Sequence, residues 1–466
     1  MSRAWTLPGV AEYQYGKPPS IWWGVLAVVV IQTAGLLITV VNWEQGKPVM
    51  SEPFFGRAFL LSLLISGGVC ALIYSGYEDW IERVDWWNFL CRSERATWRQ
   101  WAQAHVVIVD SIALTPEPEL GERLLGLEGS APINPGKILP LPDTEGSTGV
   151  SRLAMVLEQL MSRFSASLAH HDASGHAVDV ILQSADKDDL TELRAVWRKL
   201  YLPDLVQFGW VPFGAKQANI ETWFDKECTS DFRLLLGCQL HAEGTEPAWS
   251  EAAVAMLLTS PRVVASLKGT VRPQARLFRP IAMPSDSVVE TLLASEQTPR
   301  RRIRHAWISD LPSQGRHATL GAIDDARLEL PVHDVDRAIG KPGPVNALLL
   351  QALAAQMVAH GQGAQLVASA SAQKVRLNLV GTKLVPVPRV DAGYARLLSL
   401  SVTVAGSCWL GVVMVGLNAL NASPGWFWAC IGGFVLLFLI QVGGSYLRRN
   451  LVEDDFFRQL RRMEAR

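Results

Sequence analysis

"AIGKPGPVNALLLQALAAQMVAHGQGAQLVASAS", residues 338–371, joins a turn rich in glycine and proline to a long apolar segment and then to a run of small residues. The apolar spacing predicts a helix over 346–359 and a strand over 365–369. We expect Gly340 and Gly343 to shape the turn, because glycine adopts positive φ at little steric cost.

The residues before and after this unit alternate between strand-like and helix-like patterns. Strands are predicted at 105–116, 177–184, 231–241, 251–261, 274–280, 301–312 and 374–381, and helices at 151–168, 188–200 and 285–295. The stretch 208–227 is expected to be a turn followed by a helix, and 117–149 an irregular loop. Alternating strands and helices are typical of an α/β domain whose helices cover its sheets. We therefore expect an α/β domain over about 105–384.

Four long uncharged runs flank this domain in two pairs. They lie at 21–41, 58–74, 397–420 and 426–447, and the second predicted span covers about 57–75. Each is near the ~20 residues that an α-helix needs to cross a bilayer. The alternatives are a buried core helix or, for the first run, a signal peptide, although that run starts late and does not end in a small-residue cleavage site. The pattern predicts two transmembrane hairpins, within 1–77 and over 397–447, with the α/β domain inserted between them.

Arginine and lysine are concentrated on one side of these predicted spans. They crowd the residues after the second span and the tail at 448–466. In the loop 42–56, Lys47 is the only basic residue. Because basic residues favour the cytoplasmic side, both termini and about 78–396 are predicted to be cytoplasmic. We expect a multi-pass protein of a bacterial inner membrane, with the lipid bilayer as one partner.

Residues 78–104, "EDWIERVDWWNFLCRSERATWRQWAQA", combine charge with several tryptophans. Tryptophan is enriched at membrane–water interfaces, so this segment is interpreted as a juxtamembrane helix lying on the membrane. The alternative is an ordinary connector helix whose tryptophans pack on protein.

Composition and motif searches exclude several classes of site. The 466 residues have a formal net charge of −1, which gives no electrostatic reason to expect nucleic-acid binding. Six cysteines form no CxxC pair or Cys/His cluster, so no zinc site is expected. His170, His171 and His176 are interpreted as part of a solvated turn rather than a metal site. "PGK" at 135–137 lacks the spacing of a phosphate loop, and no cofactor or metal is expected.

The order of elements resembles the thiolase fold of β-ketoacyl synthases, which joins two similar α/β halves. Four stretches carry this resemblance over about 105–380: "VVIVDSIALTP", "CTSDFRLLLGCQLH", "SEAAVAMLLTSP" and "IGKPGPVNALLLQALAAQM". They are similar to the family's opening "VVITGxGxVSP" strand, its "xCDxALAGG" strand, its "EGAAALVLE" strand and its "GHxxGAAGxxxLxxAxxxL" turn and helix. The resemblance implies a thiolase-like domain, and it makes a homodimer an expectation.

The residues that carry the family's chemistry are not found at the corresponding positions. The family's turn histidine falls on Lys341, and its nucleophilic cysteine falls near Pro212, Phe213 and Gly214. Cysteine nucleophiles in the family lie at a helix N-terminus, where the helix dipole lowers the thiol pKa. Cys228 comes too late for that place, and Cys238 lies inside a predicted strand, as buried cysteines commonly do. The domain is therefore interpreted as thiolase-like but degenerate.

One basic cluster remains as a candidate binding site. Arg300, Arg301, Arg302 and Arg304 open a predicted strand and could bind phosphate or anionic lipid, or could simply be solvated.

Two functions from different classes are predicted for the whole chain. The first is a non-catalytic, membrane-anchored binding or assembly protein with a protein partner. Similarity to inert thiolase-like proteins suggests an adaptor or loading factor for a type VI secretion effector, a step based on fold analogy alone. The alternative is a membrane-bound acyltransferase or ketosynthase-like enzyme acting on acyl chains, for which no nucleophile can be placed.

Overall fold

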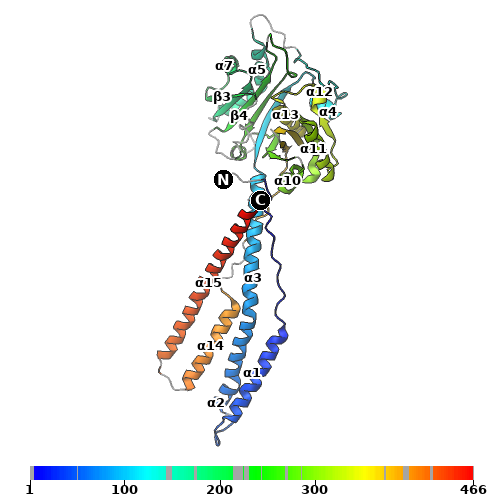
Figure 1. Ribbon diagram of the computed structural model, residues 1–466. Helices are drawn as coiled ribbons and strands as arrows, with labels where there is room; N and C mark the ends of the chain where they lie inside the picture. Colours follow the sequence, from blue (N-terminus) through cyan, green and yellow to red (C-terminus); the bar gives the residue numbers. More distant parts are fainter. Residues whose placement is uncertain are drawn as a thin grey trace. The chain divides into compact units, whose positions relative to one another are not determined.

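The computed structural model describes residues 5–49, 51–142, 150–172, 176–213, 224, 230–242, 244–267, 271–284, 286–371, 374–391, 398–419, 423 and 425–464. The chain divides into two compact units. An α/β unit comprises Met1–Leu7 and Trp98–Val387, and a helical unit comprises Pro8–Thr97 and Pro388–Arg466. Figure 1 shows the elements of each unit along the chain.

The α/β unit is built from one large sheet and the helices around it. Its strands are β1 (His105–Leu114), β2 (Val178–Ser184), β3 (Val206–Pro212), β4 (Phe232–Gln239), β5 (Ala252–Thr259), β6 (Ala275–Phe278), β7 (Ile281–Met283), β8 (Ile303–Ser309), β9 (Val332–Asp334), β10 (Ala364–Ser371) and β11 (Lys374–Gly381). Its helices are α4 (Leu120–Leu124), α5 (Arg152–Ser162), α6 (Ser165–Asp172), α7 (Asp189–Lys199), α9 (Pro261–Ser266), α10 (Val288–Ser295), α11 (Ser313–Asp325), α12 (Val335–Ile339) and α13 (Asn346–Ala359), with a 3₁₀ turn, η2, at Arg300–Arg302.

The sheet contains an internal repeat. Its strand order is β3-β2-β4-β5-β1-β6-β11-β10-β8-β9, with β7 paired to β11. In the first half β2 runs parallel to β3 and β4, and β5 runs antiparallel to β4 and β1. In the second half β8 runs parallel to β9 and β10, and β11 runs antiparallel to β10 and β6. The two halves thus share one order and one set of directions, and β1 joins β6 antiparallel between them.

Helix α13 is enclosed by this sheet. It packs against β1, β5, β6, β8, β10 and β11, and also against α4. Apolar side chains lie all around the helix, as expected for a helix that is buried on every side. Leu349, Leu350 and Leu353 are among those that form one core cluster with Met256 of β5 and Leu277 of β6. The helix predicted at 346–359 therefore has the same bounds in the structure and forms the central core.

Two further core clusters lie under the outer helices. Leu157 and Leu160 of α5 and Leu193 of α7 pack on the first half of the sheet. Val288 of α10 and Ile323 of α11 pack on the second half. The repeat therefore extends to the helices, since α7 connects β2 to β3 and α11 connects β8 to β9.

Several elements differ from the sequence-based expectation. The stretch beginning at 208 was expected to be a turn and a helix, but Val206–Pro212 is strand β3, paired along its length with β2. The helix expected after it lies outside the described residues, apart from 224. Helix α11 and strand β9 were not predicted, and the loop at 117–149 contains the short helix α4.

Among its described residues, the helical unit contains four helices that are long and apolar enough to cross a membrane. Its elements are α1 (Ile21–Val41), α2 (Glu52–Phe55), the π-helical turn η1 (Gly56–Leu60), α3 (Leu61–Ala102), α14 (Leu400–Ala419) and α15 (Gly425–Glu464). Three of the expected apolar segments lie within helices, the remaining one, 397–420, contains α14, and two of the four helices extend well beyond the segments. Helix α3 continues through the tryptophan-rich segment, and α15 continues through the basic tail.

Small residues bring the apolar helices close together. A Cβ at Gly67 of α3 would lie 3.1 Å from Sγ of Cys408 on α14. A Cβ at Gly406 of α14 would overlap the side chain of Leu437 on α15. Glycine at such contacts lets helices pack closely in a membrane. The glycines that interrupt the second apolar run are therefore packing sites.

The tryptophans of α3 are divided between buried and exposed positions. Trp87 is only 3% exposed and packs with Val10, Val452 and Phe456 in the helical unit. Trp98, in the α/β unit, is 2% exposed. These two side chains pack on protein, as the connector alternative expects, whereas Trp80 is 39% exposed.

Candidate functional site

The turn before α13 is held by backbone hydrogen bonds to two neighbouring segments. Gly340 has a φ of 88°, a conformation that favours glycine. The N–H of Lys341 donates to the carbonyl oxygen of Lys137 over 2.8 Å, and the carbonyl oxygen of Lys341 accepts from the N–H of Ser250 over 2.9 Å. The Lys341 side chain is exposed. The backbone at this position is therefore fixed while the ammonium group faces solvent.

Gln239, at the end of β4, lies directly beside this turn. Its side chain is fully buried. Its Nε2 donates to the carbonyl oxygen of Ser250 over 2.8 Å, and its Oε1 accepts from the N–H of Val345 over 2.8 Å. Gly343 does not have a positive φ, so the expected reason for glycine there is wrong. The reason is steric, because a Cβ at Gly343 would lie 2.6 Å from Oε1 of Gln239.

A chain of polar side chains continues from Gln239 into the second half of the sheet. Nε2 of Gln239 also donates to Oδ1 of Asn346 over 3.3 Å, and Nδ2 of Asn346 donates to Oγ of Ser309 over 3.0 Å. The Ser309 hydroxyl donates to Oδ1 of Asp336, and the N–H of Asp310 donates to Oδ2 of Asp336 over 2.8 Å. We call these five residues the α13 polar cluster, because they meet at the N-terminal end of that helix.

The two carboxyl groups of the cluster have perturbed acidities. Burial raises the pKa of Asp336, and the nearby carboxylates of Asp334 and Asp310 raise it further, although hydrogen bonds from Ser309 and Asp310 act in the opposite direction. Burial also raises the pKa of Asp310. Asp310 has a φ of 57°, which is uncommon for a residue other than glycine. Perturbed carboxyls and unusual backbone geometry both occur preferentially at functional sites.

The hydrogen bonds limit what this cluster can do chemically. Ser309 is 1% exposed, and its hydroxyl both accepts from Asn346 and donates to Asp336. A serine nucleophile needs a base that takes its proton and a path for the substrate. Within the described part of the chain, no histidine hydrogen-bonds to Ser309 or Asp336. The cluster is therefore arranged as a set of mutually satisfied polar groups.

The positions to which the resemblance assigns the nucleophile make no described hydrogen bond or ion pair with this cluster. Pro212 ends β3, and Phe213 packs edge-to-face on Trp249 with the ring centroids 6.0 Å apart. Gly214 and Cys228 lie outside the described residues. Cys238 is 3% exposed in β4, and burial raises its pKa to about 12. A thiol with this acidity is not a thiolate near neutral pH, as expected for a core cysteine.

The predicted basic cluster is exposed and has few described partners. Arg300 forms part of the 3₁₀ turn η2, and its Nη2 donates to the carbonyl oxygens of Ala326 and Arg327. Arg301, Arg302 and Arg304 are exposed beside it. Anion binding by these arginines stays a prediction.

The histidine-rich turn is only partly described. Nδ1 of His176 lies 2.9 Å from Oδ2 of Asp231, while the side chains of His170 and His171 lie outside the described residues. Among described residues no group of three histidine, cysteine or carboxylate side chains is arranged to hold a metal.

Sequence reasoning missed a buried ion pair near the turn. Glu251, at the start of β5, has a fully buried side chain. Nη1 and Nη2 of Arg152 donate to its two carboxylate oxygens over 2.7 and 2.5 Å, and the N–H groups of Leu141 and His241 donate to them over 2.7 Å each. Only the charge inside the apolar "SEAAVAMLL" run could have indicated that this glutamate is paired.

Comparison with solved structures finds neighbours of low sequence identity. No family model matches the chain, and no curated protein matches it by sequence. One structural neighbour is the ketosynthase complex AntDE:AntF, with 10% identity and a TM-score of 0.43, covering 60% of this chain and 99% of that chain. Another is an oxazolomycin ketosynthase domain of Streptomyces albus, with 12% identity and a TM-score of 0.40, covering 62% and 99%. A third is human mitochondrial 3-ketoacyl-CoA thiolase, with 9% identity and a TM-score of 0.37, covering 60% and 99%.

Proposed function

We propose that this chain is a membrane-anchored binding or assembly protein whose thiolase-like α/β unit does not carry out acyl chemistry. The observation that carries this proposal is the α13 polar cluster. Gln239, Asn346, Ser309 and Asp336 direct their hydrogen bonds at one another and at neighbouring backbone groups. A site that stabilises a developing oxyanion instead keeps donors free to point at the reacting substrate.

The surroundings of the cluster support the same function. Lys341 stands where the sequence resemblance places a histidine, and its side chain is exposed. Cys238 is buried with a raised pKa, so it does not supply a reactive thiolate. The domain would then act through its surfaces, as a body that binds another protein.

The anchoring part of the proposal concerns the four apolar helices. They would form two hairpins across a bacterial inner membrane, four crossings in all, with both termini and the central domain in the cytoplasm, because arginine and lysine crowd those segments. Topology reporters fused at Lys47 and Ser423 should then report the periplasm. A reporter at Gln351 that also reports the periplasm would reverse the proposed orientation.

The proposed binding partner is another protein. A protein partner follows from a non-catalytic domain held at a membrane, and the role of adaptor for a type VI secretion effector stays a prediction from fold analogy. A homodimer likewise stays a prediction.

Incubation with acyl thioesters tests the non-catalytic proposal directly. The purified full chain would be mixed with malonyl and palmitoyl thioesters, and thiol release and the intact mass would both be followed. We expect thiol release at the rate of the buffer and no covalent acyl adduct. Release that exceeds the buffer rate and is lost on Ser309→Ala substitution would overturn the proposal.

Asp310 is the observation that favours the alternative, an enzyme acting on acyl chains. This carboxyl has a raised pKa, a positive φ and an exposed side chain directly after β8. Such a residue could act as an acid or base. An Asp310→Asn variant that keeps normal membrane abundance but fails to complement a deletion strain would favour the enzyme. Complementation at the wild-type level would favour the binding protein.

A further inference from the structure

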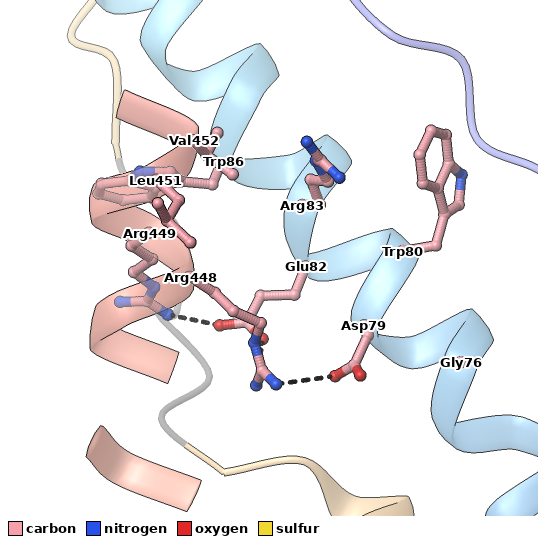
Figure 2. A pocket seen from close by; sticks show the side chains of 10 residues that line it. All are labelled: Gly76, Asp79, Trp80, Glu82, Arg83, Trp86, Arg448, Arg449, Leu451 and Val452. Atoms are coloured by element: carbon pink, nitrogen blue, oxygen red, sulfur yellow. Dashed lines mark hydrogen bonds and ion pairs between the residues drawn. The ribbon is translucent and has the colours of Figure 1, made fainter. Parts of the chain in front are cut away.

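A pocket within the helical unit lies between α3 and α15. Its volume is about 290 Å³, and it is lined by residues of Gly76–Trp86 on α3 and Arg448–Val452 on α15 (Figure 2). Apolar and charged side chains are mixed in its walls. Trp80, Trp86 and Leu451 contribute apolar surface, and the charged groups are Asp79, Glu82, Arg83, Arg448 and Arg449.

The pocket lies where both helices change from uncharged to charged sequence. Across the end of η1 and the start of α3, the residues from 58 to 77 carry no charged side chain, and Glu78 is the first that does. In α15 the residues from 425 to 447 are uncharged, and Arg448 is the first charged residue. If both helices cross the membrane, this transition marks the boundary between hydrocarbon and headgroups. The pocket is then at the depth of lipid phosphates.

Two arginines of the pocket form only long ion pairs with the carboxylates near them. Nη1 of Arg448 lies 3.6 Å from Oδ1 of Asp79, and Nη2 lies 3.6 Å from Oε2 of Glu82, with 48% of the side chain exposed. Nη2 of Arg83 lies 3.8 Å from Oδ2 of Asp455, with 54% exposed. These separations are too long for hydrogen bonds, so both groups keep N–H donors for a ligand.

Arg449 differs from these two arginines. Its Nη2 donates to Oε1 of Glu82 over 3.3 Å, its side chain is only 16% exposed, and its guanidinium lies 5.2 Å from the ring centre of Trp86. Arg449 therefore holds α15 against α3 by an ion pair and a cation–π contact. Arg449 shapes the pocket, so its replacement would disturb the packing of α15 as well as any ligand.

One residue of the lining, Trp86, also carries a neutral hydrogen-bond donor. The indole Nε1 of Trp86 is buried and has no hydrogen-bond partner among the described residues. A buried donor without a partner is costly, and a ligand oxygen or a water would relieve that cost. Leu451, which is 62% exposed, offers apolar surface on the α15 side of the pocket, whereas Trp80 points away from α15 and stacks on Tyr13 with the ring centroids 6.2 Å apart (Figure 2).

We propose that this pocket binds the phosphate group of an anionic phospholipid. The fork of Arg448 would donate to the phosphate oxygens, since guanidinium groups suit phosphate geometry, and Arg83 adds positive charge to the same lining. Leu451 would contact the glycerol and the start of the acyl chains. Within the lining three arginines face two carboxylates, and Asp455, which lies 3.8 Å from Arg83 outside the lining, is paired more closely with Arg458 over 2.7 Å. The inference rests on the proposed insertion of the helices into a membrane.

Native mass spectrometry of the full chain in detergent tests this site. The lipid probe would be phosphatidylglycerol, compared with phosphatidylcholine, which has the same phosphate but no net charge. We expect one phosphatidylglycerol molecule to remain bound at concentrations where phosphatidylcholine does not. Equal binding of both lipids would overturn the anionic specificity. Displacement by millimolar glycerol 3-phosphate would show a site for soluble phosphate and would overturn the lipid assignment.

Variants of one helix provide the matched comparison. Arg448→Gln should weaken phosphatidylglycerol binding about tenfold, the effect of losing one charge-assisted hydrogen bond of roughly 1.4 kcal/mol. Arg462→Gln, on the same helix but outside the pocket, should bind as the wild type does. Arg448→Lys keeps the charge, loses the fork and should bind with intermediate affinity, and it replaces Arg448→Gln if that variant does not fold.

The results for these variants test the lipid site independently of the membrane anchoring. Unchanged binding in Arg448→Gln, or equal loss in Arg462→Gln, would overturn the site. A chain that inserts into membranes yet retains no phosphatidylglycerol would also overturn it, while leaving the anchoring proposal intact.

Discussion

Nε2 of Gln239 donates to Oδ1 of Asn346 over 3.3 Å, and both side chains are buried. Gln239 ends β4 in the first half of the sheet, and Asn346 begins α13 in the second half. This contact therefore joins the two repeated halves of the sheet at the turn before α13. Because buried amides cost free energy when they lose a partner, the contact also fixes the register of α13 against the sheet.

Replacement of Asn346 should destabilise the α/β unit. Asn346→Ala removes partners from Ser309, Gln239 and the N–H of Gly343. Leaving buried groups unsatisfied should lower the free energy of unfolding by about 1–3 kcal/mol. Lys341→Ala is the control, because its exposed side chain should change this free energy by less than about 0.5 kcal/mol. Urea unfolding of the full chain in detergent, followed by tryptophan fluorescence, measures both.

A side chain at position 343 should conflict with Gln239 specifically. Gly343→Ala places a Cβ 2.6 Å from Oε1 and 2.8 Å from Cδ of Gln239, and should cost about 1–3 kcal/mol. In a double-mutant cycle with Gln239→Ala, the combined loss should be smaller than the sum by at least about 0.5 kcal/mol, because the alanine removes the clash.

Gly340→Ala is the matched comparison for this cycle. At Gly340 a Cβ would overlap the carbonyl oxygen of Lys137, and φ is 88°. Neither problem involves Gln239, so Gly340→Ala combined with Gln239→Ala should be nearly additive. Additivity in the Gly343 cycle as well would contradict the steric explanation.

The sequence allowed the local elements of the core to be predicted. Helix α13 and strand β11 have their predicted bounds, because apolar residues fill the first and alternate along the second without interruption. Strand β3 was missed because "VQFGWVP" contains a glycine and a proline and is incompletely buried along its length. Such residues favour a turn in isolation, and pairing with β2 overrides that preference.

The polar cluster could not be predicted for a different reason. Its members come from positions 239, 309, 310, 336 and 346, and only the fold brings them together. No spacing along the chain relates Gln239 to Ser309. Two similar halves were expected from the order of elements and its resemblance to the thiolase fold, but the strand pairing that relates them is seen only in the sheet.

The pH dependence of stability should reveal the buried carboxyl of Asp336. Burial raises its pKa, so the folded chain keeps this proton at pH values where the unfolded chain, with an ordinary aspartate pKa near ~3.9, loses it. The stabilisation is fully present below ~pH 3.9 and is lost as pH rises through the folded-state pKa. Relative to Asp336→Asn, the wild type should therefore be most stable near pH 4 and lose that advantage toward pH 7.

Unfolding midpoints at several pH values between about 4 and 7 measure this difference. Asp325→Asn, an exposed carboxyl on α11, is the matched comparison for the same chemical change. A wild-type advantage over Asp336→Asn that grows with pH would contradict the assignment of a raised pKa.

Glu78 should hold the two hairpins of the helical unit together. Its Oε1 accepts from the N–H of Leu400 over 2.8 Å, and its Oε2 accepts from the N–H of Ser401 over 2.9 Å and from the hydroxyl of Ser399 over 3.0 Å. These are the first N–H groups of α14, which have no partner within their own helix. Burial acts to raise the pKa of Glu78, but the bonds from Ser401, Leu400 and Ser399 outweigh it and lower the pKa.

Glu78→Gln should weaken this attachment by about 1–2 kcal/mol, because a neutral amide accepts more weakly and loses the interaction with the helix dipole. Since the folded-state pKa is lowered, the wild-type advantage should be present above the ordinary glutamate pKa near ~4.3 and disappear as pH falls through the lowered value. Glu44→Gln, in the loop after α1, is the control. Thermal unfolding in detergent at about pH 7 and pH 4 distinguishes the two, and an equal loss in both variants at pH 7 would show that Glu78 does not hold α14.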